Sequence, residues 1–80
     1  MEHDTEKFEA KQTEILELMA EMDTGEELAI MAVEAMQSPE QQELMLEYLH
    51  EVDEAQEVLT EQNLLRAIVV IHTRAPAQNT

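Results

Sequence analysis

The sequence predicts an all-α fold, a small bundle of three or four helices that is completed by homodimerisation. Three observations predict it. Apolar residues recur at spacings of three and four along most of the chain, Ser38-Pro39 marks a helix start, and residues 64–71 (LLRAIVVI) are apolar except for Arg66. The 80 residues make one domain at most, and without cysteine neither a disulfide nor a cysteine-ligated zinc can stabilise it. Oligomerisation remains as a source of stability.

Helices are expected at about 6–22, 25–37, 39–59 and 61–73, with disordered ends at 1–5 and 74–80. The first helix ends before Gly25, the only glycine in the chain. The third begins at Ser38-Pro39, where serine is a preferred N-cap, proline suits the first helical position and Gln41 completes a capping box.

Two boundaries leave alternatives open. The apolar stripe of the third helix continues in phase to Leu59, which favours a break at Thr60, although Asp53 with Gln56 forms a second capping-box pattern that would break it earlier. The β-branched residues of 67–73 also suit a strand, but a lone strand would need a partner across a dimer. Helix is the favoured prediction.

The helices expected at 25–37 and 61–73 are apolar around most of their circumference. Two amphipathic helices cannot enclose both, and the surplus would leave a larger exposed apolar patch than soluble monomers usually carry. A homodimer, or a stable hetero-complex, is therefore expected. The residues expected in its interface or core are Met31, Leu64, Leu65, Ile68, Val69 and Ile71.

The net charge of −15 makes direct binding to nucleic acid or to an anionic membrane surface unfavourable. The N-terminus is charged and lacks the apolar core of a signal peptide, and the longest apolar run is far shorter than the ~20 residues of a membrane span. We therefore expect a cytoplasmic protein.

Candidate chemistry is sparse. Glu47 and His50 form a Glu-x-x-His pair, the spacing that di-metal helical bundles use, and Glu34 could add a carboxylate. Glu47 and His50 lie opposite the apolar stripe, however, whereas metal ligands project inward, so a solvated face is favoured. The only serine, Ser38, is explained as a cap. No cofactor and no enzymatic activity are expected.

The most specific functional feature is a row of glutamates at spacings of three and four, here called the carboxylate ridge: Glu40, Glu43, Glu47, Glu51, Glu54, Glu57 and Glu61. On one continuous helix it would extend over ~31 Å. Such a row resembles a phosphate track that could occupy a basic groove, although a charge run is more often only a solvated face.

The expected function is that of a small, acidic, non-enzymatic protein–protein interaction module that dimerises through its apolar helices. One alternative is an acidic inhibitor that mimics nucleic acid and blocks a basic site on another protein. The other is a metal-binding bundle that uses the Glu-x-x-His pair.

Overall fold

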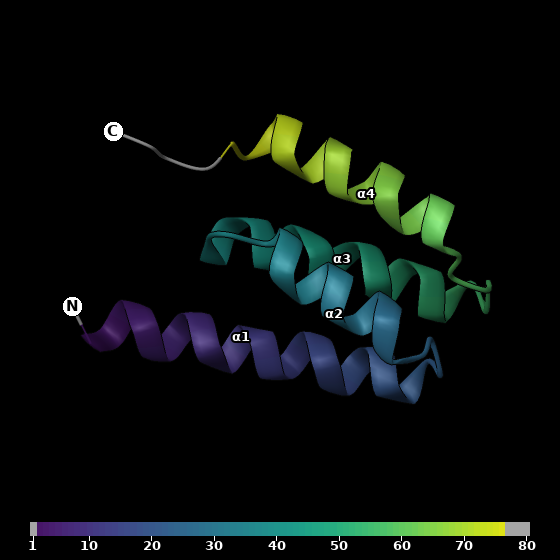
Figure 1. The fold of residues 1–80 in the computed structure, drawn as a ribbon, viewed down its shortest axis with the longest axis horizontal. Coiled ribbons are helices and arrows are strands. Elements are labelled where there is room, and N and C mark those ends of the chain that lie inside the picture. The colour runs from purple at the N-terminus through teal and green to yellow at the C-terminus, as the bar shows by residue number, and fades with distance from the viewer. Residues whose placement is uncertain (1, 77–80) are drawn as a thin grey trace.

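The computed structural model describes residues 2–76, and it describes side chains from residue 6 onward. It contains four helices in the described residues: α1 (Glu2–Glu21), α2 (Glu26–Ala35), α3 (Pro39–Glu54) and α4 (Glu61–Arg74). Successive helices run in opposite directions (Figure 1). The predicted all-α class is confirmed, and residues 67–73 are helical rather than a strand.

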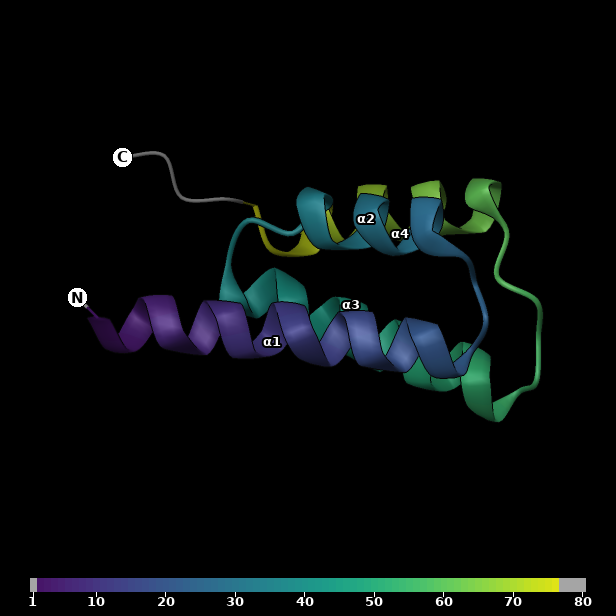
Figure 2. The same cartoon turned by 60° about the horizontal axis from the view of Figure 1, so that its bottom comes forward.

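The helices form two layers, with α1 and α3 in one and α2 and α4 in the other (Figure 2). α1 packs against α2 and α3, while α4 packs against α3 and α2. α1 and α4 therefore lie diagonally, and the short connection from α2 to α3 passes from one layer to the other. Among the described residues each helix packs mainly against two others, which leaves one side of each uncovered.

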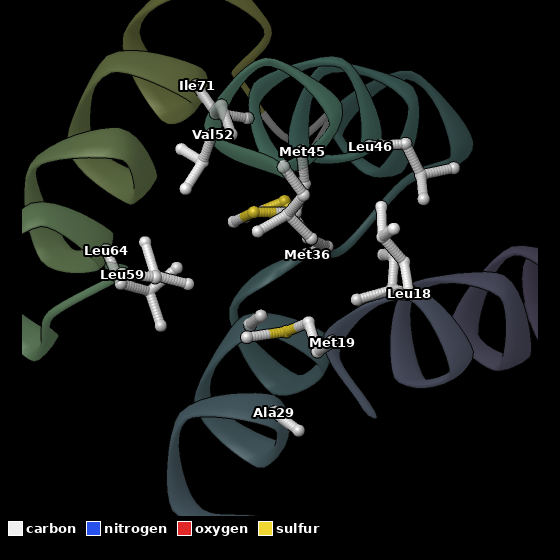
Figure 3. Close-up of a cluster of buried hydrophobic side chains, with 13 residues drawn as sticks. Leu18, Met19, Ala29, Met36, Met45, Leu46, Val52, Leu59, Leu64 and Ile71 are labelled. Atoms are coloured by element: carbon white, nitrogen blue, oxygen red, sulfur yellow. The ribbon is translucent and has the colours of Figure 1, made fainter. Parts of the chain in front are cut away.

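The core lies between the layers and takes side chains from all four helices (Figure 3). Methionines fill much of it. Met19, Met36 and Met45 are fully buried, and Met22 and Met31 pack partly buried against the same core. Flexible thioethers suit the irregular space left by a chain with almost no aromatic side chains.

The first helix begins earlier than the sequence predicts. α1 starts at Glu2, so the expectation of a disordered segment at 1–5 is wrong for residues 2–5. No helix-breaking residue separates Glu2 from Glu6.

α1 ends in a Schellman motif with Asp23 in the left-handed conformation (φ 58°). Gly25 lies at the break, as expected, but it serves the next helix. It is the N-cap of α2, with φ of 96°, a value that strains a residue with a side chain.

The third helix ends at Glu54, so the prediction that it continues to Leu59 is wrong. The Gln56 N–H donates to the Asp53 carbonyl and the Glu57 N–H to the Val52 carbonyl, which is a second Schellman motif, with Gln56 at φ 56°. The helix thus breaks near Asp53. The residues there form a C-terminal cap of α3 and not the N-terminal capping box of a new helix. A loop from 55 to 60 then leads to Thr60, whose hydroxyl accepts a hydrogen bond from the Asn63 N–H and caps α4.

Ser38 caps α3 as expected, accepting from the Gln41 N–H at 3.2 Å. The second half of the capping box is shifted by one residue, because the Gln41 side-chain oxygen accepts from the Gln37 N–H at 2.6 Å. The same side chain donates through Nε2 to the Ala75 carbonyl at 2.7 Å.

Two further side-chain hydrogen bonds join distant segments. The neighbouring Gln42 donates through Nε2 to the Phe8 carbonyl of α1 at 3.0 Å, and His72 Nε2 lies 2.7 Å from the Ala35 carbonyl at the end of α2.

The expectation of a disordered tail from 74 is wrong for residues 74 and 75. Arg74 is the last residue of α4, and Ala75 is buried and accepts the hydrogen bond from Gln41. The part of that expectation concerning 77–80 lies outside the described residues.

Candidate functional site: the α4 face and the α3–α4 groove

α4 carries an exposed apolar surface. Leu65, Val69 and Val70 are 46%, 64% and 52% exposed, and we call them the α4 apolar face. Within a single chain, the helix that the sequence predicts to be apolar around most of its circumference is thus only partly buried. Only Leu64, Ala67 and Ile71 of α4 are buried, because only α2 and α3 pack against this helix.

A groove runs beside this face, between α3 and α4, with a volume of about 330 Å³. Leu44, Ala67, Val70 and Ile71 supply its apolar lining. Val70 belongs to both surfaces, so the α4 apolar face continues into the groove. Together they form one apolar surface centred on α4.

The polar lining of the groove has opposite charges on its two sides. α3 contributes Glu47 and Glu51, whereas α4 contributes Arg66 and Arg74. Arg66 and Arg74 are two of the four basic residues in the whole chain. Among the side chains described, the one ion pair lies elsewhere, between Lys11 Nζ and Glu43 Oε2 at 3.1 Å.

Tyr48 and Asn63 also line the groove, and the Tyr48 hydroxyl donates to the Asn63 carbonyl at 3.5 Å. Burial, and secondarily the nearby Glu57 carboxylate, raises the pKa of Tyr48 above its ordinary 10.0. The hydroxyl therefore stays protonated at neutral pH and remains a hydrogen-bond donor.

The residues expected in the interface or core divide into two groups. Leu64 and Ile71 lie in the core, with Met31 and Ile68 packed partly exposed against it. Leu65 and Val69 point outward on the α4 apolar face.

The carboxylate ridge is interrupted. Five of its members, Glu40, Glu43, Glu47, Glu51 and Glu54, are exposed on α3. They extend over ~21 Å rather than the ~31 Å of a continuous helix. Glu57 lies in the loop and Glu61 in the first turn of α4, both exposed.

The candidate metal ligands Glu47 and His50 are exposed on α3, and Glu34 is exposed on α2. Within the described part of the chain, no group of three or more His, Cys, Asp or Glu residues is arranged to hold a metal ion. The helices described also include none that is long and apolar enough to cross a membrane.

Sequence reasoning missed Val70, Tyr48, Arg66 and Arg74 as groove residues. Arg74 also lies in the last turn of α4, where a positive charge is favourable to the helix dipole. The available signal was the position of two arginines eight residues apart on an apolar helix of an otherwise acidic chain.

No protein-family model, no curated protein and no solved structure matches this chain.

Proposed function

We propose that this protein is a non-enzymatic protein–protein interaction module that forms a homodimer through its apolar helix α4. The observation that carries the proposal is the exposure of Leu65, Val69 and Val70 next to an apolar groove. Water contact with this surface is unfavourable by about 25 cal/mol for each Å² of apolar area, and a partner that covers it removes that cost.

The composition of the groove supports binding over catalysis. Its lining contains no serine, cysteine, lysine or histidine, which are the common nucleophiles and general bases. The two glutamates of the lining are exposed. A surface of this kind can recognise a partner by shape and charge.

The test is the solution mass of the purified protein, measured by light scattering after size exclusion at low and at high salt. We expect a dimer at both salt concentrations, because apolar burial does not require low salt and screening reduces repulsion between two chains of charge −15. Val69→Glu should weaken the dimer on the order of a hundredfold, since it places an unpaired charge in the interface.

Leu16→Glu is the matched control. Leu16 is an exposed apolar residue like Val69, at 42% against 64%, but it lies on α1, diagonally across the bundle from α4. This variant should keep the wild-type mass. A wild-type protein that stays monomeric across the accessible concentration range would refute the proposed homodimer.

The five exposed glutamates on α3 favour a second candidate, an acidic inhibitor that occupies a basic site on another protein as nucleic acid would. Its binding should fall steeply with salt and be lost on charge reversal at Glu47, Glu51 and Glu54. Val69→Glu should leave that binding intact, which separates this candidate from apolar docking.

A further inference from the structure

The charges lining the α3–α4 groove are arranged so that the groove can be complementary to itself. A two-fold symmetric interface joins the same surface patch of both chains. If one residue of the first chain contacts a second residue of the other chain, the reciprocal contact forms as well. A patch carrying one sign of charge would repel itself in such an arrangement. This groove carries Glu47 and Glu51 on one side, Arg66 and Arg74 on the other, and apolar side chains between them.

Arg74 is also displaced along the groove from the two glutamates, whereas Arg66 lies nearer to them. α3 and α4 run in opposite directions, and Tyr48 lies opposite Asn63, so Glu47 faces the first half of α4 (Figure 1). Arg74 is at the other end of α4, eight residues beyond Arg66, which corresponds to ~12 Å along the helix. Glu47 and Arg74 of one chain therefore lie toward opposite ends of the groove.

We infer that the groove and the α4 apolar face bind α4 of a second copy, antiparallel to the first, about a two-fold axis that passes near Val70. This inference rests on the proposed homodimer and gives its geometry. Rotation about that axis exchanges the ends of the groove, so Arg74 of each chain comes to the end of the other groove that holds Glu47, Glu51 and Arg66, where the two glutamates outnumber the arginine. Val69 and Val70 of the two chains meet near the axis.

The size of the interface supports the participation of α3. A stable dimer usually buries on the order of 800 Å² on each partner, about one seventh of the 5688 Å² that this chain exposes. α4 is ~21 Å long and ~10 Å wide, so its outer face alone offers less than that area. The glutamate side of the groove must therefore be covered as well.

The test uses two charge reversals, Glu47→Arg and Arg74→Glu, each in the full chain. Both side chains are exposed, and neither is part of the core, so circular dichroism should show wild-type helix content. Each variant alone replaces two opposite-charge contacts across the dimer with two like-charge contacts. We expect each to weaken self-association on the order of tenfold at low salt, and less at high salt.

Mixing the two variants gives the decisive measurement. In a heterodimer one of the two contacts pairs wild-type Glu47 with wild-type Arg74, and the other pairs the introduced arginine with the introduced glutamate. An equimolar mixture should therefore dimerise about as tightly as wild type, and so should the chain carrying both substitutions. An ion pair formed within one chain would not give recovery in the mixture.

Glu54→Arg and Lys7→Glu are matched controls, because they make the same charge changes at exposed positions outside the groove. They should leave the dimer unchanged apart from the effect of net charge. One result would overturn this geometry and leave the proposed function standing. In that result Val69→Glu disrupts the dimer, but neither groove reversal weakens it more than its control does. A monomeric wild-type protein would overturn both.

Discussion

Two adjacent glutamines, Gln41 and Gln42, are both completely buried, yet they should respond in opposite directions to the same substitution. Gln41 uses both ends of its amide, accepting from Gln37 N–H and donating to the Ala75 carbonyl. Gln42 uses only its Nε2, which donates to the Phe8 carbonyl, while its Oε1 is buried with no hydrogen-bond partner among the described residues. Replacing each in turn by methionine keeps the length of the side chain and removes the amide.

The structure sets the expected magnitudes. Gln41→Met leaves the buried Ala75 carbonyl and the partly buried Gln37 N–H unpaired. The unpaired carbonyl should lower the free energy of unfolding by about 1–3 kcal/mol, and the partly buried N–H should lower it by less. Gln42→Met removes an unpaired oxygen of similar cost. It also loses the hydrogen bond from Nε2 to the Phe8 carbonyl, but that carbonyl lies inside α1 and keeps its main-chain partner. The change in side-chain hydrophobicity is common to both variants, so Gln42→Met should be the more stable by about 3 kcal/mol.

The assay is urea unfolding followed by far-ultraviolet circular dichroism, with all proteins at one concentration because self-association adds to the apparent stability. We expect Gln41→Met to fall below wild type and Gln42→Met to equal or exceed it. The reasoning is refuted if Gln41→Met is as stable as Gln42→Met.

Three further predictions concern single side chains. The unfolded chain loses the Tyr48 proton near the ordinary pKa of 10.0 and the folded chain only at higher pH, so the free energy of unfolding should fall as pH rises above about 10. Tyr48→Phe should remove this pH dependence of the free energy of unfolding. Absorbance titration of Tyr48, the single tyrosine of the chain, should show a lower pKa in Glu57→Gln than in wild type. Gln56→Gly should stabilise the protein by about 0.5–1 kcal/mol in urea unfolding by relieving a left-handed residue, whereas Gln56→Ala should not. His72→Leu should cost about 1 kcal/mol because it leaves the last carbonyl of α2 without its side-chain partner, while the same change at the exposed His50 should be neutral in the same assay.

The fold class and the starts of α3 and α4 could be predicted because their causes are local. Ser38 and Thr60 are good N-caps by residue type, and each accepts a hydrogen bond from the main chain three residues on. Helical periodicity then reports which side of each helix is buried.

The end of α3 could not be predicted from the same kinds of signal. Gln56 adopts a left-handed conformation that usually marks glycine or asparagine, so the residue type gives no warning. Leu59 remains buried although it lies in the loop, which keeps the apolar stripe in phase beyond the last helical residue. A periodic pattern cannot distinguish a helical residue from a loop residue that reaches the same core.

The candidate site was predicted in part. The sequence shows the surplus of apolar side chains on residues 64–71, and from it Leu65 and Val69 are predicted to lie in the interface or core. The groove was not visible, because it depends on which helix lies beside α4. Only the placement of α3 next to α4 brings Glu47 to the same groove as Arg74.

The attachment of α4 is uneven along its length, and this has a consequence for local opening. Its last turns are held by His72 to the Ala35 carbonyl and by Gln41 to the Ala75 carbonyl, both 2.7 Å long. Its first turns are held by the buried Leu64 and by the exposed Tyr48–Asn63 hydrogen bond of 3.5 Å, and they follow a loop in which only Leu59 is buried. Amide hydrogens near Leu65 should therefore exchange with solvent sooner than those near Ile71, through partial unfolding that begins at Thr60. Opening at the Thr60 end would widen the groove while the hydrogen bonds of His72 and Gln41 stay intact. The helix of a second copy would then enter the groove without unfolding of the bundle.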